Sequence, residues 1–270
     1  MKKVMISVAP VSAEDTCIDP EKIAEDVIHC YHEGASMVHL HVRDRKGKLT
    51  SDMTVLEETI RKIKAETDIV IEVSTGGVSD LTIQERCRPC FSSLVEATSL
   101  NVGSVNLGKA VYRNPADDVR YCAEQIVKQG KRPEIEVFEL GMIHTSRQLA
   151  EEFDMIRPIL FALVFGHEGE MPPTKDALEH MMQYLYQNFS KEEAFWGYTQ
   201  ANRKNWNMIR TALDYGAVSL RIGFEDSDCL ETGLHARTNA ELVRKAVALL
   251  HEKKMEPMTP AEVRTMMNIP

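Results

Sequence analysis

The chain has no hydrophobic run of membrane-spanning length, and its 270 residues carry a formal net charge of −9. A transmembrane helix needs about 20 mostly apolar residues, and the apolar stretch at residues 4–9 is also too short for the core of a signal peptide. The negative charge argues against nucleic acid or an anionic membrane as the main partner, so any anionic ligand must be held by a local site. We therefore expect a cytoplasmic protein that acts on small molecules.

Cysteine and glycine-rich motifs are also scarce. The six cysteines are scattered, which fits a reducing compartment better than a disulfide framework. Cys87 and Cys90 form one C-x-x-C pair without a second pair, and this favours a structural role for them. The chain contains no G-x-x-x-x-G-K-[ST] motif, and no G-x-G-x-x-G follows the first predicted strand, so the common nucleotide-binding patterns are missing. No internal repeat, low-complexity tract or linker divides the chain, and we expect one domain over residues 1–270.

Strand-like and helix-like segments alternate along the whole chain. The strands are predicted at residues 4–9, 37–43, 69–73, 94–100, 134–139, 159–165, 194–198 and 218–224. The helices are predicted at residues 20–33, 53–66, 82–87, 116–128, 146–152, 175–187, 204–215 and 239–251. Such alternation is typical of a parallel sheet, and eight units in this length predict an α/β fold of the closed (β/α)8 TIM barrel type.

An open, doubly wound sheet is the alternative fold, but it usually needs fewer units and a glycine-rich first turn. The remaining residues, 255–270, predict a short C-terminal extension that is helical and packs either on the barrel or on another subunit.

Two histidines, His39 and His41, stand one residue apart in an apolar, β-branched run. Side chains at positions i and i+2 lie on the same face of a strand, about 7 Å apart. Two imidazoles so placed can share one metal ion. The alternative is a pair of half-buried histidines with separate hydrogen bonds.

Polar residues gather where the predicted strands end, which is the active-site end of a TIM barrel. They include Glu14, His39, His41, Arg43, Glu72, Ser74, Ser99, Asn101, Glu136, Glu139, His167, Arg221, Glu225 and Asp226. Glu225 is a natural third ligand, and two histidines with one glutamate form a known catalytic zinc pattern. Such a metal polarises a carbonyl group or lowers the pKa of a bound water. The alternative for Glu225 is a surface carboxylate in a loop.

Several segments, in the same order along the chain, resemble the β-keto acid cleavage enzymes. The matching segments are VHLHVR at 38–43, VSTGG at 73–77, SLNVG at 99–103, NLG at 106–108, PEIEVFELGM at 133–142 and RIGFED at 221–226, with Ala13 and Glu14 near the N-terminus. The resemblance implies a zinc-dependent TIM barrel, usually a homotetramer. It also implies a reaction in which a β-keto acid and acetyl-CoA yield acetoacetate and a new acyl-CoA.

The resemblance assigns roles to individual residues. The ligands of the metal, Zn²⁺ or another divalent transition metal, would be His39, His41 and Glu225. Asp226 would be the general base, set up by a charged pair of Arg221 and Glu136. The substrate-binding residues would be Ser74, Ser99, Asn101 and Glu14. Ser74 and Ser99 would bond the substrate carboxylate or the developing oxyanion, and Glu14 would face the distal end of the substrate.

The chain departs from the family pattern in two loops, at residues 165–173 and 197–203. We expect these loops to contact CoA or the substrate, so their divergence leaves the acyl substrate open more than the chemistry. For Glu14, the alternative is that its carboxylate caps a loop or pairs with Lys22 or Arg203.

Two other functions compete with this prediction. A metallohydrolase of the amidohydrolase type also uses H-x-H on a barrel strand, with further histidines and an aspartate for which His144, His167 and Asp226 are candidates. That class places its H-x-H on the first strand, whereas here it lies on the second. A non-catalytic binding barrel is the second alternative, and it leaves the converging charged residues unexplained.

Overall fold

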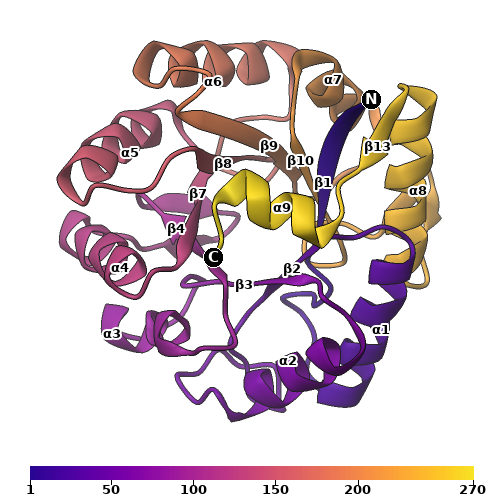
Figure 1. Cartoon of the computed structure of the whole chain (residues 1–270), viewed down its shortest axis with the longest axis horizontal. Coiled ribbons are helices and arrows are strands. Elements are labelled where there is room, and N and C mark those ends of the chain that lie inside the picture. Colours follow the sequence, from indigo (N-terminus) through magenta and orange to yellow (C-terminus); the bar gives the residue numbers. More distant parts are fainter.

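The computed structural model describes residues 1–270, and eight parallel strands form a closed barrel at its centre (Figure 1). These strands are β1 (Lys2–Val8), β2 (Met37–Leu40), β3 (Val70–Val73), β4 (Ala97–Asn101), β7 (Arg132–Val137), β8 (Ile159–Phe165), β9 (Ala194–Gln200) and β10 (Ser219–Ile222). Each strand pairs with the next, and β10 pairs back to β1 with Arg221 opposite Ser7. The TIM barrel is therefore confirmed, and the open sheet is excluded.

Eight helices surround the strands (Figure 1). They are α1 (Pro20–His32), α2 (Thr54–Glu66), α3 (Ile83–Arg86), α4 (Ala116–Lys128), α5 (Leu140–Glu152), α6 (Lys175–Asn188), α7 (Asn207–Tyr215) and α8 (Asn239–Glu252). Alternate residues of β1, which are Val4, Ile6 and Val8, belong to the large core that also contains helix residues, as the two-residue period of a strand requires. None of the helices is long and apolar enough to cross a membrane.

Some element boundaries differ from the predicted ones. Helix α5 begins at Leu140, six residues before the predicted start, and its buried residues include Met142, Ile143 and Leu149 at helical spacing. The EVFE run at 136–139 extends the apparent strand and conceals this helix start. Strand β2 ends at Leu40, so His41 lies just beyond it.

Short hairpins on the loops were not predicted. They are β5 (Val105–Leu107) with β6 (Ala110–Tyr112), and β11 (Cys229–Glu231) with β12 (Leu234–His235). Each lies in the loop that follows a barrel strand, β4 for the first and β10 for the second. Both hairpins therefore lie at the end of the barrel where the strands end.

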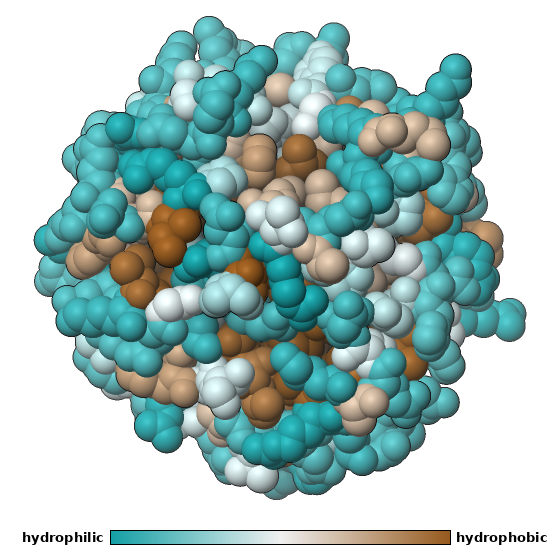
Figure 2. All heavy atoms as spheres, in the orientation of Figure 1, coloured by the Kyte–Doolittle hydropathy of each residue, from teal (hydrophilic) through white to brown (hydrophobic).

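The C-terminal segment closes the opposite end of the barrel. Strand β13 (Met255–Pro257) pairs with β1, and helix α9 (Pro260–Met267) lies across the barrel opening (Figure 1). Val263 and Met267 of α9 belong to a small apolar cluster that includes Met37 and Val70, the first residues of β2 and β3. Figure 2 shows this end as a mainly hydrophilic surface with separate apolar areas. The C-terminal segment therefore packs on the barrel of its own chain, which is one of the two arrangements that the sequence predicted.

Candidate active site

A glycine turn after β10 places two successive carboxylates at the top of the barrel. Gly223 has a φ of +151°, and a Cβ atom there would lie 2.1 Å from the carbonyl oxygen of Ala9. Only glycine allows this approach without strain. The backbone N–H of Glu225 donates to the same Ala9 oxygen at 3.2 Å, and that of Asp226 donates to the Gly223 oxygen at 3.1 Å. The turn therefore ties the strand end to β1 and presents both acidic side chains.

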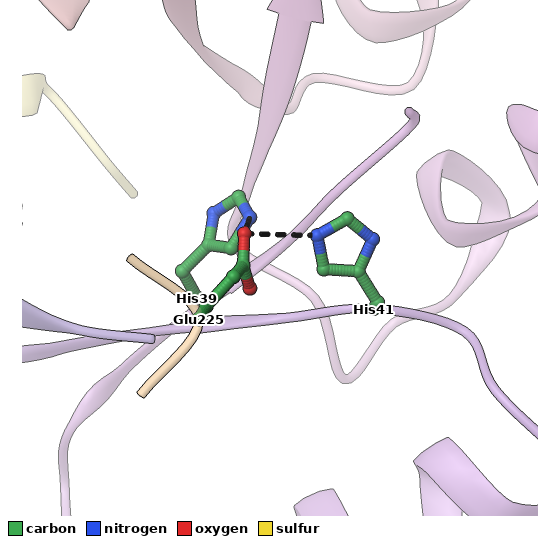
Figure 3. Close-up of side chains that lie close together, drawn as sticks. All are labelled: His39, His41 and Glu225. Atoms are coloured by element: carbon green, nitrogen blue, oxygen red, sulfur yellow. Dashed lines mark hydrogen bonds and ion pairs between the residues drawn. The ribbon is translucent and has the colours of Figure 1, made fainter. Parts of the chain in front are cut away.

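His39, His41 and Glu225 converge on one point (Figure 3). The Nε2 atom of His41 is 3.3 Å from Oε1 of Glu225, and Nε2 of His39 is 3.8 Å from the same oxygen. Two ligands at about 2.1 Å from a tetrahedral Zn²⁺ lie about 3.4 Å apart, so both separations suit a shared ion. The three side chains are at most 15% exposed. The donor set and the spacing thus fit a transition metal.

Two buried carboxyl groups, those of Glu72 and Glu134, lie beside His39 and orient its ring. Nδ1 of His39 is 2.9 Å from Oε1 of Glu72, which leaves Nε2 free for the metal, a common arrangement around metal-bound histidines. Glu72 lies against Glu134, and both side chains are buried. Burial raises the pKa of Glu72 to about 8. Burial, followed by the charge of Glu72, raises the pKa of Glu134 well above its ordinary range.

Sequence reasoning did not identify these acceptors, although the strand period carried a signal for them. Glu72 is two residues before Ser74, and Glu134 is two residues before Glu136. Each pair therefore points to the same face of its strand. A carboxylate in a buried strand on the face that carries the site residues is thus a candidate partner of a metal ligand.

The raised pKa of Glu134 predicts a pH-dependent stability. The folded protein keeps a proton on Glu134 that the unfolded chain releases near its ordinary pKa of 4.5. The native state thus binds more protons above that pH, and stability should fall as the pH rises, by at most about 1.4 kcal/mol per pH unit. Glu134→Gln keeps a neutral side chain of similar shape and should reduce this slope.

Urea unfolding of both proteins between about pH 5.5 and about pH 8.5 measures the two slopes. Glu192→Gln, at an exposed position, is the matched control and should follow the wild type. Parallel curves for wild type and Glu134→Gln would contradict the prediction.

Arg221 connects the acidic residues of the site. Its Nε and one terminal nitrogen donate to the two oxygens of Asp226 at 3.0 and 2.6 Å, and its other terminal nitrogen donates to Glu136 at 2.9 Å. Burial alone would lower the pKa of Arg221, but Asp226, Glu225 and Glu136 raise it well above its ordinary value. The guanidinium is therefore charged, and it holds the Asp226 carboxylate by two hydrogen bonds in a fixed orientation.

The ionisation of Glu225 follows from the same charges. Burial raises the pKa of Glu225, but the nearby His41 and Arg221 outweigh that effect and lower it. Glu225 is thus an anionic side chain between two imidazoles, as a metal ligand should be.

A cavity of about 780 Å³ lies above these residues, and we call it the inner cavity. Its polar lining includes His41, Arg43, Ser74, Glu136, Arg221 and Asp226, and its apolar lining includes Leu49, Leu107, Tyr112, Phe138 and Val164. Ser74 and Ser99 form a buried serine pair with 3.3 Å between their Oγ atoms, and Ser74 is the member that lines the inner cavity. Asn101 lies behind the cavity wall, beside Gly76, with both amide atoms unpaired.

A second cavity of about 860 Å³, the outer cavity, adjoins the first. The two share four lining residues, Ala13, His167, Glu225 and Asp226. Glu14 is exposed and lines the outer cavity, not the inner one. Its role toward the substrate therefore stays a prediction, whereas the other predicted site residues lie in or directly behind the inner cavity.

The geometry does not favour an amidohydrolase. His144 lies on α5 and is exposed, so it is not near the metal cluster in the way that class requires. His167 lines both cavities, but its Nδ1 is 3.0 Å from Glu170. The cluster at the barrel top consists of His39, His41 and Glu225 without a further histidine.

Solved structures share the fold. The ternary complex of ObcA with C4-CoA adduct and oxalate superposes with a TM-score of 0.79 at 20% identity, covering 93% of this chain and 67% of that one. HMG-CoA lyase from Brucella melitensis superposes with a TM-score of 0.62 at 11% identity, covering 100% and 98% of the two chains. At these identities the likeness supports the barrel architecture.

Sequence relatives add the family. The 3-keto-5-aminohexanoate cleavage enzyme of Acetoanaerobium sticklandii is 31% identical over 278 residues, which cover 100% of this chain and 99% of the relative. The 3,5-dioxohexanoate:acetyl-CoA acetone transferase of Paraburkholderia graminis is 28% identical, with 99% and 96% covered. The 3-oxoadipate:acetyl-CoA acetyltransferase of Cupriavidus necator is 30% identical, with 89% and 83% covered. The family model described as beta-keto acid cleavage enzyme matches residues 3–269, and the chain therefore belongs to the β-keto acid cleavage enzyme family.

Proposed function

We propose that this protein converts a β-keto acid and acetyl-CoA into acetoacetate and a new acyl-CoA. One observation carries the proposal: the cluster of His39, His41 and Glu225 and the carboxylate of Asp226 lie where two cavities meet. A reaction between two substrates needs such a junction. The names of relatives from Paraburkholderia graminis and Cupriavidus necator, which include acetyl-CoA and a keto acid, support it.

His39, His41 and Glu225 would hold the metal ion, for which we propose Zn²⁺. A bound Zn²⁺ supplies a Lewis acid that stabilises negative charge on the keto oxygen of the substrate. Site affinity alone does not select zinc over neighbouring transition metals, so the donor set of two imidazoles and one carboxylate is the support for this choice. We also propose a homotetramer, which light scattering of the purified protein would measure.

Asp226 would start the reaction by removing a proton from the carbon between the keto and carboxylate groups. Arg221 holds both oxygens of Asp226, so the base is oriented before the substrate binds. Ser74, at the wall of the inner cavity, can donate a hydrogen bond to the substrate carboxylate or to the developing oxyanion. Such preorganised donors are a main source of catalytic stabilisation.

The remaining steps exchange two acyl groups. The carbanion attacks the thioester carbon of acetyl-CoA, and the CoA thiolate leaves. The thiolate then adds to the original keto carbon, and the bond between this carbon and the former α-carbon breaks. The released enolate takes a proton back from Asp226 and leaves as acetoacetate, which contains the acetyl group. The rest of the substrate remains as acyl-CoA, so no oxidant or water is consumed.

A panel of β-keto acids tests the function. Each would be mixed with acetyl-CoA and the metal-loaded protein, and acetoacetate and acyl-CoA would be measured together. We expect equal amounts of the two products with at least one member of the panel. A panel without acetoacetate formation above the rate without protein would contradict the proposal.

The charge of the substrate tail is a further prediction. Ala13 lines both cavities, and Glu14 follows it at an exposed position of the outer cavity. A substrate tail that extends from the inner cavity to Ala13 would meet the carboxylate of Glu14, which disfavours an anionic tail. We therefore expect a higher kcat/KM for 3-keto-5-aminohexanoate than for 3-oxoadipate, which carries a second carboxylate. Glu14→Gln should reduce this preference. A preference for the diacid that persists in Glu14→Gln would count against the prediction.

A further inference from the structure

The outer cavity contains three cations without carboxylate partners. Arg203, Lys204 and Arg237 line it. Two of its acidic residues are already paired, because Asp228 is 2.9 Å from His235 and Glu231 forms an ion pair with Lys245. Glu225 and Asp226 face the metal cluster and Arg221. Glu14 is the remaining free carboxylate of the lining, so the unpaired charge of this cavity is positive.

Arg203 is the most unusual of the three cations. Its side chain is 2% exposed, and its Nε and one terminal nitrogen have no hydrogen-bond partner. The other terminal nitrogen donates to the carbonyl oxygen of Cys229 at 3.1 Å, and the guanidinium stacks 4.4 Å from the ring centre of Trp206. A buried guanidinium with unused donors is costly. Arg203 belongs to the lining of the outer cavity, and its two unpaired donors are suited to an anionic or carbonyl oxygen of a ligand.

The three cations differ in where they lie in the outer cavity. Arg203 is buried in the same lining as Asp226, near the reacting atoms. Lys204 and Arg237 are exposed and stand at the solvent side. CoA has a matching polarity, since a pantetheine arm separates its thioester from its phosphate groups.

We propose that the outer cavity is the acetyl-CoA site. The thioester lies at the Asp226 end, with its carbonyl oxygen facing Arg203, and the CoA phosphates lie at Lys204 and Arg237. This proposal rests on the proposed function, because it places the second substrate of that reaction. It leaves the inner cavity to the β-keto acid, and the carbanion formed there meets the thioester at the shared residues Glu225 and Asp226.

Binding of CoA by titration calorimetry to the metal-loaded protein is the first test. Lys204→Ala/Arg237→Ala should raise the Kd of CoA at least tenfold, because two phosphate contacts are lost. Lys191→Ala/Arg88→Ala removes the same charges from exposed positions outside both cavities and should leave the Kd within twofold of wild type. An equal Kd in wild type and the Lys204/Arg237 variant would overturn the proposal.

A truncated thioester separates phosphate contact from loss of structure. S-acetylpantetheine lacks the nucleotide and its phosphates, so it does not reach Lys204 and Arg237. The ratio of kcat/KM for acetyl-CoA to that for S-acetylpantetheine should fall at least tenfold in the Lys204/Arg237 variant. Arg203→Lys, which retains the charge but loses the two-pronged donor, should lower kcat/KM for both thioesters. An unchanged ratio, or a full rate in Arg203→Lys, would overturn the assignment.

Failure of this proposal and failure of the proposed function are distinguishable. Exchange of the acidic protons of the β-keto acid for deuterium without CoA reports the inner site of the wild type alone. Exchange above the uncatalysed rate together with an unchanged Kd in the Lys204/Arg237 variant would overturn the assignment of acetyl-CoA to the outer cavity. The proposed function would still stand. A wild type that neither exchanges protons nor binds CoA would overturn both.

Discussion

Replacement of Asp226 by asparagine should lower kcat by about 10² to 10⁴, the usual contribution of a general base. The amide cannot accept the substrate proton. In the wild type, Arg221 donates to both oxygens of Asp226. The asparagine side chain would replace one of these oxygens by an NH2 group, which cannot accept from Arg221. The metal ligands are unchanged in this variant, so metal content should stay at the wild-type level. Steady-state kinetics and elemental analysis of the same sample measure both quantities.

The matched control for this prediction is Asp214→Asn on α7. Asp214 is an exposed aspartate that pairs with Lys253 and lines neither cavity. It should retain wild-type kcat. A fall of less than about tenfold in Asp226→Asn, which corresponds to about 1.4 kcal/mol of barrier, would place the base elsewhere.

Removal of a metal ligand should abolish metal binding and activity together. Glu225→Gln keeps the shape of the side chain but removes the anion that lies 3.3 Å from His41 and 3.8 Å from His39. Carboxylate and imidazole ligands bind a transition metal in their deprotonated forms, and a neutral amide is a much weaker ligand. We expect one ion per wild-type chain and a large loss of bound metal in Glu225→Gln.

His39→Ala should have the same effect on metal content and a further effect on stability. It leaves Glu72 without the imidazole that lies 2.9 Å away in a fully buried position, and an unpaired buried polar group is destabilising. Elemental analysis and thermal unfolding would be measured for both variants. His180→Ala, at an exposed position of α6, is the control. Full metal content in Glu225→Gln or His39→Ala would refute the ligand assignment.

The fold class could be read from the sequence because it depends on local periodicity. Most strands of the barrel are short runs rich in apolar residues, as in β1 and β8, and each amphipathic helix carries its own period. The pairing of His39 with His41 is also local, since residues two positions apart in an extended run face the same side, even though β2 itself ends at Leu40. Local periodicity does not locate the start of α5, because a strand-like run continues directly into the helix. The helix begins at Leu140, before the predicted start.

The composition of the site depended on barrel closure. Glu225 reaches His41 across 184 positions of the chain, and Arg221 reaches Glu136 across 85. The contacts between these residues depend on the pairing of β10 with β1 and on the stagger of the strands between them, which is fixed when the barrel closes. The position of Glu225 at a strand end made it a candidate ligand, with a loop carboxylate as the alternative, and the family resemblance supplied the pairing of Arg221 with Glu136.

The contacts that no sequence argument supplied are those made by buried or loop side chains. The support of His39 by Glu72 and Glu134 brings together side chains from β2, β3 and β7, with β4 between the last two strands. The burial of Arg203, with two donors unpaired, depends on how the loops after β9 and β10 pack against each other. Loop packing follows from the tertiary structure, because loop residues have no period of their own. The sequence by itself therefore determined the barrel and its pair of histidines, and only the closed, packed structure decided what surrounds them.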